Sequence, residues 1–194
     1  MTDASYWDNR YQRGETGWDL GAPSTPLKTY IDQLTDKELA ILIPGCGNSY
    51  EAEYLLEQGF TNVTLIDISP TLTARLSRKF EQQPGRKPTI ITGDFFALNG
   101  QFDLILEQTF FCALDPALRP AYVEQMHKLL KPGGQLAGVL FNRDFDGGPP
   151  FGGHTEEYEQ LFGKFFTIRT LAPCYNSIKP REGNEAFIIA EKPS

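Results

Sequence analysis

Three short segments of this chain place glycine or aspartate directly after a run of apolar residues. Gly45 and Gly47 follow the first run, Asp67 ends the second, and Asp94 follows the third. Glycine lets the backbone approach a ligand with no Cβ in the way. A carboxylate at a strand end can accept hydrogen bonds from both hydroxyls of a ribose, and a second carboxylate suits an adenine amino group. Together these residues indicate a site for an adenosine-containing cofactor, although either aspartate alone could simply cap the helix after it.

The glycine pattern argues against a phosphate-binding loop. A dinucleotide site uses the pattern G-x-G-x-x-G, whereas Gly45-Cys-Gly47 is followed by Asn48, Ser49 and Tyr50, so the third glycine is missing. The chain also lacks the Gly-Lys-Ser/Thr sequence of a P-loop. A cofactor without phosphates fits these residues better, and S-adenosylmethionine is the obvious candidate.

The N-terminal segment concentrates aromatic side chains. It holds both tryptophans of the chain, Trp7 and Trp18, and Tyr11 lies four residues after Trp7, on the same face of a helix. These rings could pack an N-terminal helix onto the core. They could also form a lid over a cationic ligand, because a sulfonium beside aromatic faces gains about 0.5–2 kcal/mol and a lid excludes water. We expect residues 1–35 to form such a lid.

The elements that must position these residues alternate between strand-like and helix-like patterns after residue 35, as in an α/β fold. Strands are expected over residues 39–43, 63–66, 88–92, 102–106, 135–141, 166–171 and 186–190, and the later helices over 119–131 and 156–162. No strong helix pattern separates the last two strands, which favours an antiparallel hairpin because a parallel return needs a crossover.

Two helix starts can be predicted from capping residues. Asn48 with Glu51 three positions later has the pattern of a capping box. Ser69 is suited to be an N-cap, because Pro70 follows it at the first helical position. Both helices would therefore begin just after a ligand-facing strand end.

Length and charge narrow the class of protein. A chain of 194 residues suits one domain spanning residues 1–194. The net charge of −7 repels phosphate backbones and anionic membranes, so neither nucleic acid nor a membrane is an expected partner. Three widely spaced cysteines favour a reducing compartment and no metal site, and no signal peptide is visible. We therefore expect a cytoplasmic protein, with a composition that permits a monomer.

Taken together, these residues resemble the thiopurine S-methyltransferase family, especially its thiol and halide methyltransferase branch, within the class I S-adenosylmethionine-dependent methyltransferases. The Pro44-Gly-Cys-Gly47 form is far more specific than a bare glycine loop. The other shared motifs cover nearly the whole chain: Trp7-x-x-x-Tyr11, Gly17-Trp18-Asp19, Asp67-Ile-Ser69, Asp94-Phe-Phe96, Phe110-Phe-Cys-Ala113, Arg119-Pro120, Leu129-Leu-Lys-Pro-Gly133, Gly147-Gly-Pro-Pro150 and Leu161-Phe-Gly163.

The resemblance implies a Rossmann-like, seven-stranded α/β sheet, mostly parallel with an antiparallel last strand and with helices on both faces. It also implies S-adenosyl-L-methionine as the cofactor and S-adenosyl-L-homocysteine as its product. The cofactor contacts that it implies are Trp7, Tyr11, Trp18, Gly45, Asp67, Asp94, Phe95 and Gln108, and the neighbouring Gly47 and Ile68 complete the expected set. The thiopurine enzymes carry Arg in place of Gln108 and the plant thiol/halide enzymes carry Tyr, which speaks against thiopurine specificity.

We expect the chain to transfer a methyl group to a small soft nucleophile, a thiol, hydrosulfide or halide, by in-line displacement. The protein would chiefly position and desolvate the reactants, so no catalytic residue stands out. A free thiol titrates near 8.5, so a nearby base or cation would raise its thiolate fraction. The expected acceptor-pocket residues are Phe110, Phe111, Arg143, Asp144 and His154, with Lys179 and Arg181 as further cationic candidates. The two phenylalanines could equally belong to the core.

Several other functions remain open from the sequence. The alternative function most similar to the expected one is that of a thiopurine S-methyltransferase or another small-molecule methyltransferase. A nucleotide-dependent oxidoreductase on the same kind of sheet is disfavoured by the missing third glycine and by the closing hairpin. A non-catalytic relative would have no need for Asp67, Asp94 and the aromatic segment together.

Overall fold

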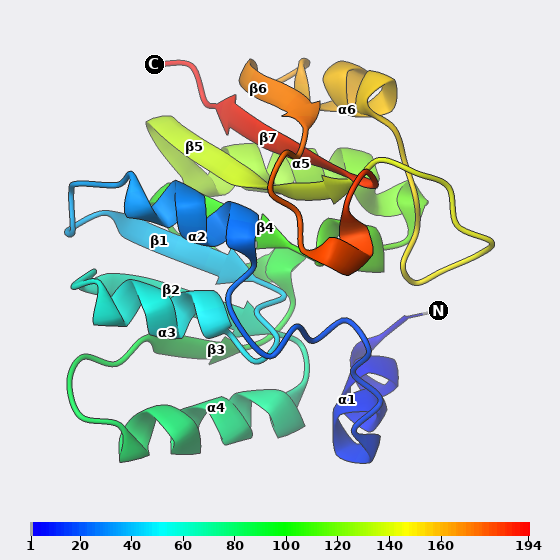
Figure 1. The fold of residues 1–194 in the computed structure, drawn as a ribbon. Helices are drawn as coiled ribbons and strands as arrows, with labels where there is room; N and C mark the ends of the chain where they lie inside the picture. The colour runs from blue at the N-terminus through cyan, green and yellow to red at the C-terminus, as the bar shows by residue number, and fades with distance from the viewer. Residues whose placement is uncertain (1) are drawn as a thin grey trace.

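Seven strands form one sheet at the centre of the computed structural model, which describes residues 2–194 (Figure 1). Across this sheet the order is β3-β2-β1-β4-β5-β7-β6, and among these strands β7 alone runs antiparallel to the rest. The strands are β1 (Ala40–Pro44), β2 (Asn62–Asp67), β3 (Thr89–Thr92), β4 (Phe102–Gln108), β5 (Leu130–Phe141), β6 (Thr167–Pro173) and β7 (Glu185–Glu191). The predicted mostly parallel sheet with an antiparallel last strand is confirmed.

Helices cover both faces of the sheet (Figure 1). One face carries α2 (Thr25–Asp32), α3 (Tyr50–Glu57) and α4 (Pro70–Gln82), and the other carries α5 (Arg119–Leu129) and α6 (Thr155–Phe162). Side chains alternate along a strand, so Ile41 and Ile43 pack under α2–α4 while Leu42 packs under α5 and α6. This is why β1 appears in the sequence as an unbroken apolar run.

The closing strands β6 and β7 form the antiparallel hairpin that the sequence predicts. β7 lies between β5 and β6 in the sheet, so α6 provides the crossover from β5 to the parallel strand β6. Only a loop with the 3₁₀ turn Lys179–Arg181 joins β6 to β7. Because β6 is parallel to β1–β5, this loop lies at the edge of the sheet where the parallel strands end.

One predicted helix start is wrong. The sequence predicts a capping box at Asn48 and Glu51, but α3 begins at Tyr50, and its N-cap residue Ser49 has a left-handed φ of 58° and makes no capping hydrogen bond. The Glu51 carboxylate instead accepts a hydrogen bond of 2.9 Å from the backbone N–H of Ser24. The loop after β1 therefore keeps an irregular backbone, and Glu51 ties the N-terminal segment to α3.

Candidate active site

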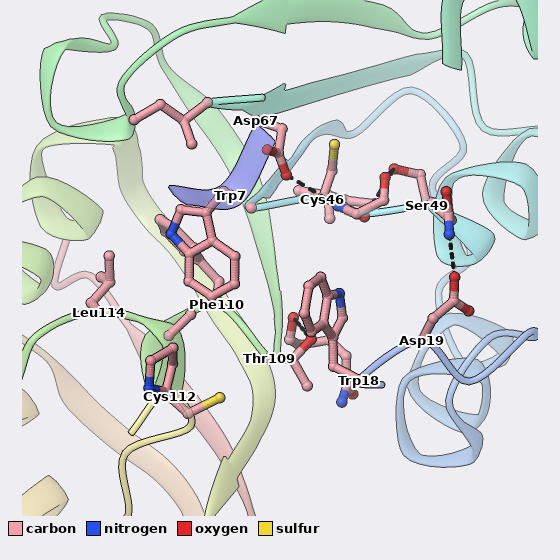
Figure 2. Close-up of a pocket in the computed structure, with 18 of the residues that line it drawn as sticks. Trp7, Trp18, Asp19, Cys46, Ser49, Asp67, Thr109, Phe110, Cys112 and Leu114 are labelled. Atoms are coloured by element: carbon pink, nitrogen blue, oxygen red, sulfur yellow. Dashed lines mark hydrogen bonds between the residues drawn. The ribbon is translucent and has the colours of Figure 1, made fainter. Parts of the chain in front are cut away.

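A cavity of about 570 Å³ lies where the loops after β1, β2, β3 and β4 meet the N-terminal segment (Figure 2). Small-molecule sites typically have volumes of about 300–1,000 Å³. The lining of the cavity includes every residue that the sequence predicts as a cofactor contact: Trp7, Tyr11, Trp18, Gly45, Gly47, Asp67, Ile68, Asp94, Phe95 and Gln108. The carboxyl edge of an open α/β sheet thus brings together residues that are far apart in the chain.

The loop after β1 needs glycine for two reasons. Gly45 and Gly47 have φ values of +56° and +53°, in the left-handed region that side chains disfavour. In addition, a Cβ at Gly45 would overlap the ring of Phe110 from the loop after β4. The missing side chain therefore lets two loops meet closely at the cavity wall.

Asp67 joins the ends of two neighbouring strands. Its side chain is buried, and its Oδ1 accepts a hydrogen bond of 3.0 Å from the Ser69 N–H. Its Oδ2 accepts a longer bond of 3.3 Å from the Gly47 N–H (Figure 2). Burial raises the pKa of this carboxyl, and the backbone N–H groups around it oppose that rise. The carboxylate is thus held rigidly at the cavity with backbone donors as its partners.

Asp94 caps a short turn and also lines the cavity. Its Oδ1 accepts a hydrogen bond of 2.9 Å from the Phe96 N–H and so caps the 3₁₀ turn Phe95–Ala97. Asp94 also lines the cavity, as does Phe95, whose ring is buried. The cap fixes the orientation of a carboxylate that still faces the ligand space.

The aromatic side chains of the N-terminal segment form a cluster over the cavity. The rings of Trp7 and Trp18 meet edge to face at 5.6 Å between centroids, and those of Tyr11 and Trp18 meet similarly at 5.7 Å. In Figure 2 the indoles of Trp7 and Trp18 lie between Asp67 and Cys46 on one side and the Thr109–Cys112 segment on the other. All three aromatic residues line the cavity, so they are placed to contact a ligand as well as one another.

Non-local polar contacts hold this segment in place. Asp8 in α1 (Ala4–Arg13) accepts hydrogen bonds of 2.7 Å from the Ser69 hydroxyl and 2.8 Å from the Thr71 N–H at the start of α4. The predicted N-cap at Ser69 is confirmed, because its Oγ also accepts a bond from the third residue of α4. A second anchor joins Asp19 to the Asn48 side chain in the loop after β1. The segment is thus fastened across two strand-end loops.

A buried carboxylate that the sequence analysis missed holds the loop after β4. Glu107 is 1% exposed and accepts hydrogen bonds of 3.0 Å from the Phe110 N–H, 2.8 Å from the Phe111 N–H and 2.6 Å from the Tyr122 hydroxyl. Burial raises the pKa of Glu107 to about 7. Thr109, within this turn, has a left-handed φ of 56°. Glu107 thus fixes the turn that directs Phe110 toward the cavity.

One part of the cavity wall combines apolar side chains with an arginine. Phe110, Leu114 and Phe141 line it together with Arg181, which comes from the loop between β6 and β7. The Arg181 guanidinium lies 5.5 Å from the centre of the Phe141 ring and donates a hydrogen bond of 3.3 Å to the Trp18 carbonyl. Its Nη1 atom is buried without a hydrogen-bond partner among residues 2–194. The guanidinium therefore lines this end of the cavity, while its Nη1 atom lies 3.8 Å from the Glu185 carboxylate.

The structure does not bring four predicted acceptor residues to this cavity. Phe111 is 2% exposed and packs in the core, with its ring centroid 5.0 Å from that of Tyr122. Arg143, Asp144 and His154 are exposed, and an isolated bridge between Arg143 and Gly153 closes their loop away from the site. Asp144 and His154 pair with each other at 3.0 Å. The loop contributes only its tip to the cavity lining, through residues 149 and 150.

Three further features concern membranes, metals and cysteines. Within residues 2–194, no helix is both long enough and apolar enough to cross a bilayer. Over the same range, no group of three or more His, Cys, Asp or Glu side chains is arranged to hold a metal ion. The three cysteines are free thiols, and two of them, Cys46 and Cys112, line the cavity.

Comparison with known proteins decides the family. The family model for thiopurine S-methyltransferase (TPMT) matches residues 2–192. The chain belongs to this family. Probable thiol methyltransferase 2 of Arabidopsis thaliana is 34% identical to this TPMT-family chain over 92% of the chain and 81% of the relative. Thiopurine S-methyltransferase of Acinetobacter baylyi is 28% identical over 92% of each protein.

Solved structures agree with this TPMT-family fold. The 1,6-didemethyltoxoflavin-N1-methyltransferase of Burkholderia thailandensis, crystallised with S-adenosylhomocysteine, superposes with a TM-score of 0.77. It is 22% identical and covers 98% of this chain, which covers 87% of it. The chain is accordingly an S-adenosylmethionine-dependent methyltransferase. The cavity fits that cofactor, because a buried carboxylate and aromatic rings line it.

Proposed function

We propose that this methyltransferase acts on a small, soft, anionic acceptor: a thiolate, hydrosulfide or halide. Arg181 is the observation that carries the proposal. Ten lining residues are assigned to the cofactor, and another part of the wall places Phe110, Leu114 and Phe141 beside the Arg181 guanidinium. An apolar wall with one cation suits a weakly hydrated anion better than an amine or a neutral alcohol.

The residues of the carboxyl edge would hold the cofactor. Asp67 would accept hydrogen bonds from the ribose hydroxyls and Asp94 from the adenine amino group, while the Gly45–Gly47 backbone would lie against the amino-acid part. The rings of Trp7 and Trp18 would face the sulfonium. They belong to the lid formed by residues 1–35, which would exclude water. When bound, S-adenosylmethionine supplies a methyl group that is already activated by a positively charged sulfur.

The protein's own residues then have to orient the acceptor, remove water from it and stabilise its charge. The apolar wall removes water from the acceptor, which makes a soft anion more reactive. Arg181 offsets the cost of that desolvation by donating to the anion from a buried guanidinium. A thiolate or halide therefore needs no further activation, and no residue is required to form a covalent intermediate.

Replacement of Arg181 by glutamine tests this assignment. A hydrogen bond to a charged group contributes about 1.5–3 kcal/mol, so the KM for iodide and for a thiolate should rise about 10- to 150-fold. The dissociation constant of S-adenosylmethionine, measured by calorimetry, should stay nearly unchanged. Lys179→Gln is the matched control, because Lys179 is exposed and two residues away. An unchanged KM for iodide in Arg181→Gln would contradict the proposal that the acceptor is an anion bound by Arg181.

A further inference from the structure

A second, much smaller cavity adjoins the acceptor end of the main one. Its volume is about 10 Å³, close to the space that a single water molecule requires. It shares Gln108, Thr109, Cys112 and Phe141 with the lining of the main cavity and adds Val139, Leu140 and Glu185. Gln108 also has a buried side-chain oxygen without a hydrogen-bond partner among residues 2–194. The two cavities are thus separated by shared side chains, with a carboxyl group on the far side.

Glu185 is poorly explained as a structural residue. It is 6% exposed at the start of β7, and its Oε2 lies 3.8 Å from Arg181 Nη1, beyond hydrogen-bond distance. Burying a carboxylate is costly, and a loosely paired one offers little stability in return. The arrangement therefore favours a chemical role, in which the carboxyl group is needed because it can change its protonation state.

The groups around Glu185 tune its affinity for a proton. Burial raises the pKa of its carboxyl, while the Ser177 hydroxyl and the Arg181 guanidinium oppose that rise. From the loop after β4 it faces the Cys112 thiol, and from β5 it faces Phe141, its partner in the sheet. Arg181 is thus the charged group beside it. A carboxyl buried in this way is a stronger base than an exposed one.

We propose that Glu185 takes the proton from a neutral thiol or hydrogen sulfide acceptor, through the small cavity, while Arg181 retains the resulting anion. This inference rests on the proposed function. The acceptor sulfur gives its proton to a water molecule in the small cavity, and that water passes a proton to the Glu185 carboxylate. The electron pair left on the acceptor sulfur forms the new bond to the methyl carbon. The bond from that carbon to the sulfonium sulfur breaks, and its electron pair stays on that sulfur. Glu185 then releases the proton to solvent.

The proposal separates two kinds of acceptor. A thiol with a pKa near 8.5 is mostly protonated at neutral pH and needs a base. Iodide carries no proton and therefore needs no base. Glu185 should therefore matter for thiols and be dispensable for iodide, whereas a residue that merely supports the fold would matter equally for both.

The test compares methyl transfer to iodide and to 2-mercaptoethanol in the wild type, in Glu185→Gln and in Glu182→Gln, an exposed control three residues earlier. General-base catalysis typically contributes about 10²–10⁴-fold, so kcat/KM for the thiol at pH 7 should fall at least about 100-fold in Glu185→Gln. Its kcat/KM for iodide should stay within about twofold of wild type, as should that of the control for both acceptors. Above the pKa of the thiol the variant should recover, because the thiolate then forms in solution.

Two results would overturn the inference. An equal loss for thiol and iodide, with cofactor affinity and melting temperature preserved, would make Glu185 a positioning residue. An unchanged pH profile for thiol methylation in Glu185→Gln would show that Glu185 is not the base. If Glu185→Gln is unstable, Glu185→Asp serves instead, and it should reduce thiol but not iodide methylation. A wild type that methylates neither acceptor contradicts the proposed function itself, and the inference fails with it.

Discussion

Replacing Asp67 by alanine should weaken S-adenosylmethionine binding about 10- to 150-fold. The proposed role of this carboxylate is to accept hydrogen bonds from the ribose hydroxyls, and hydrogen bonds to a charged group contribute about 1.5–3 kcal/mol. The structure makes the effect specific. The carboxylate is buried and held in one position by the backbone N–H groups of Gly47 and Ser69.

Isothermal titration calorimetry with S-adenosylmethionine and with S-adenosylhomocysteine measures this effect. Both ligands should lose affinity to the same degree, because they share the ribose. Asp146→Ala, on an exposed loop position, is a control that should bind as wild type does. Equal dissociation constants for Asp67→Ala and wild type would show that Asp67 only shapes the loops, and the proposed ribose contact would be wrong.

Replacing Glu107 by alanine should lower the free energy of unfolding by about 3 kcal/mol or more. The change leaves three donors without their acceptor: the Phe111 N–H and the Tyr122 hydroxyl, which are buried, and the Phe110 N–H, which is partly buried. Each unsatisfied buried group costs about 1–3 kcal/mol. Urea unfolding measures the loss, with exposed Glu124→Ala on α5 as the control. A loss of less than about 1 kcal/mol would contradict the anchoring role.

The same carboxyl should give the stability a pH dependence. Its pKa in the folded protein is about 7, above its ordinary value of 4.5, because burial penalises the charge. The folded state therefore binds this proton more tightly than the unfolded state does. The resulting stability is fully present below about pH 4.5 and is lost as the pH rises through about 7. The stability of wild type relative to Glu107→Gln should decrease over that range, and an increase would contradict the assignment.

Local sequence signals were sufficient to predict the strand ends and to group the residues from them that line one cavity. An apolar run marks each of the first strands, and the geometry of an open sheet brings the residues after these runs to one edge. Gly45, Asp67 and Asp94 could therefore be grouped from their sequence positions, although they lie on three different loops. The closing hairpin could be predicted for a related reason, since the chain offers no helix for a parallel return between its last two strands.

The incorrect predictions share a cause. Each depends on a contact between residues that are far apart in the chain. The capping box at Asn48 and Glu51 fails because the Glu51 carboxylate accepts a hydrogen bond from Ser24 instead. Of two adjacent phenylalanines, Phe110 rather than Phe111 faces the cavity, and the Glu107 anchor decides which. No periodicity in the sequence reports either contact.

The sequence also could not predict which arginine lines the cavity. Arg143 and Arg181 both lie in loops after strands, and their local sequences do not distinguish them. The bridge from Arg143 to Gly153 pairs the two ends of one loop, and only the tip of that loop lines the cavity, whereas the hairpin of β6 and β7 returns the other loop to the carboxyl edge. Only the pairing of strands separates the exposed arginine from the one that lines the cavity.

The most direct test of the central claim is methyl transfer by the wild type from labelled S-adenosylmethionine to a set of acceptors. Iodide, hydrosulfide and 2-mercaptoethanol represent soft anions and thiols, and 6-mercaptopurine represents the thiopurines. The account predicts kcat/KM values for hydrosulfide and iodide at least about tenfold above that for 6-mercaptopurine, a difference of about 1.4 kcal/mol in transition-state stabilisation. Methylation of 6-mercaptopurine with no transfer to iodide, hydrosulfide or the thiol would contradict it.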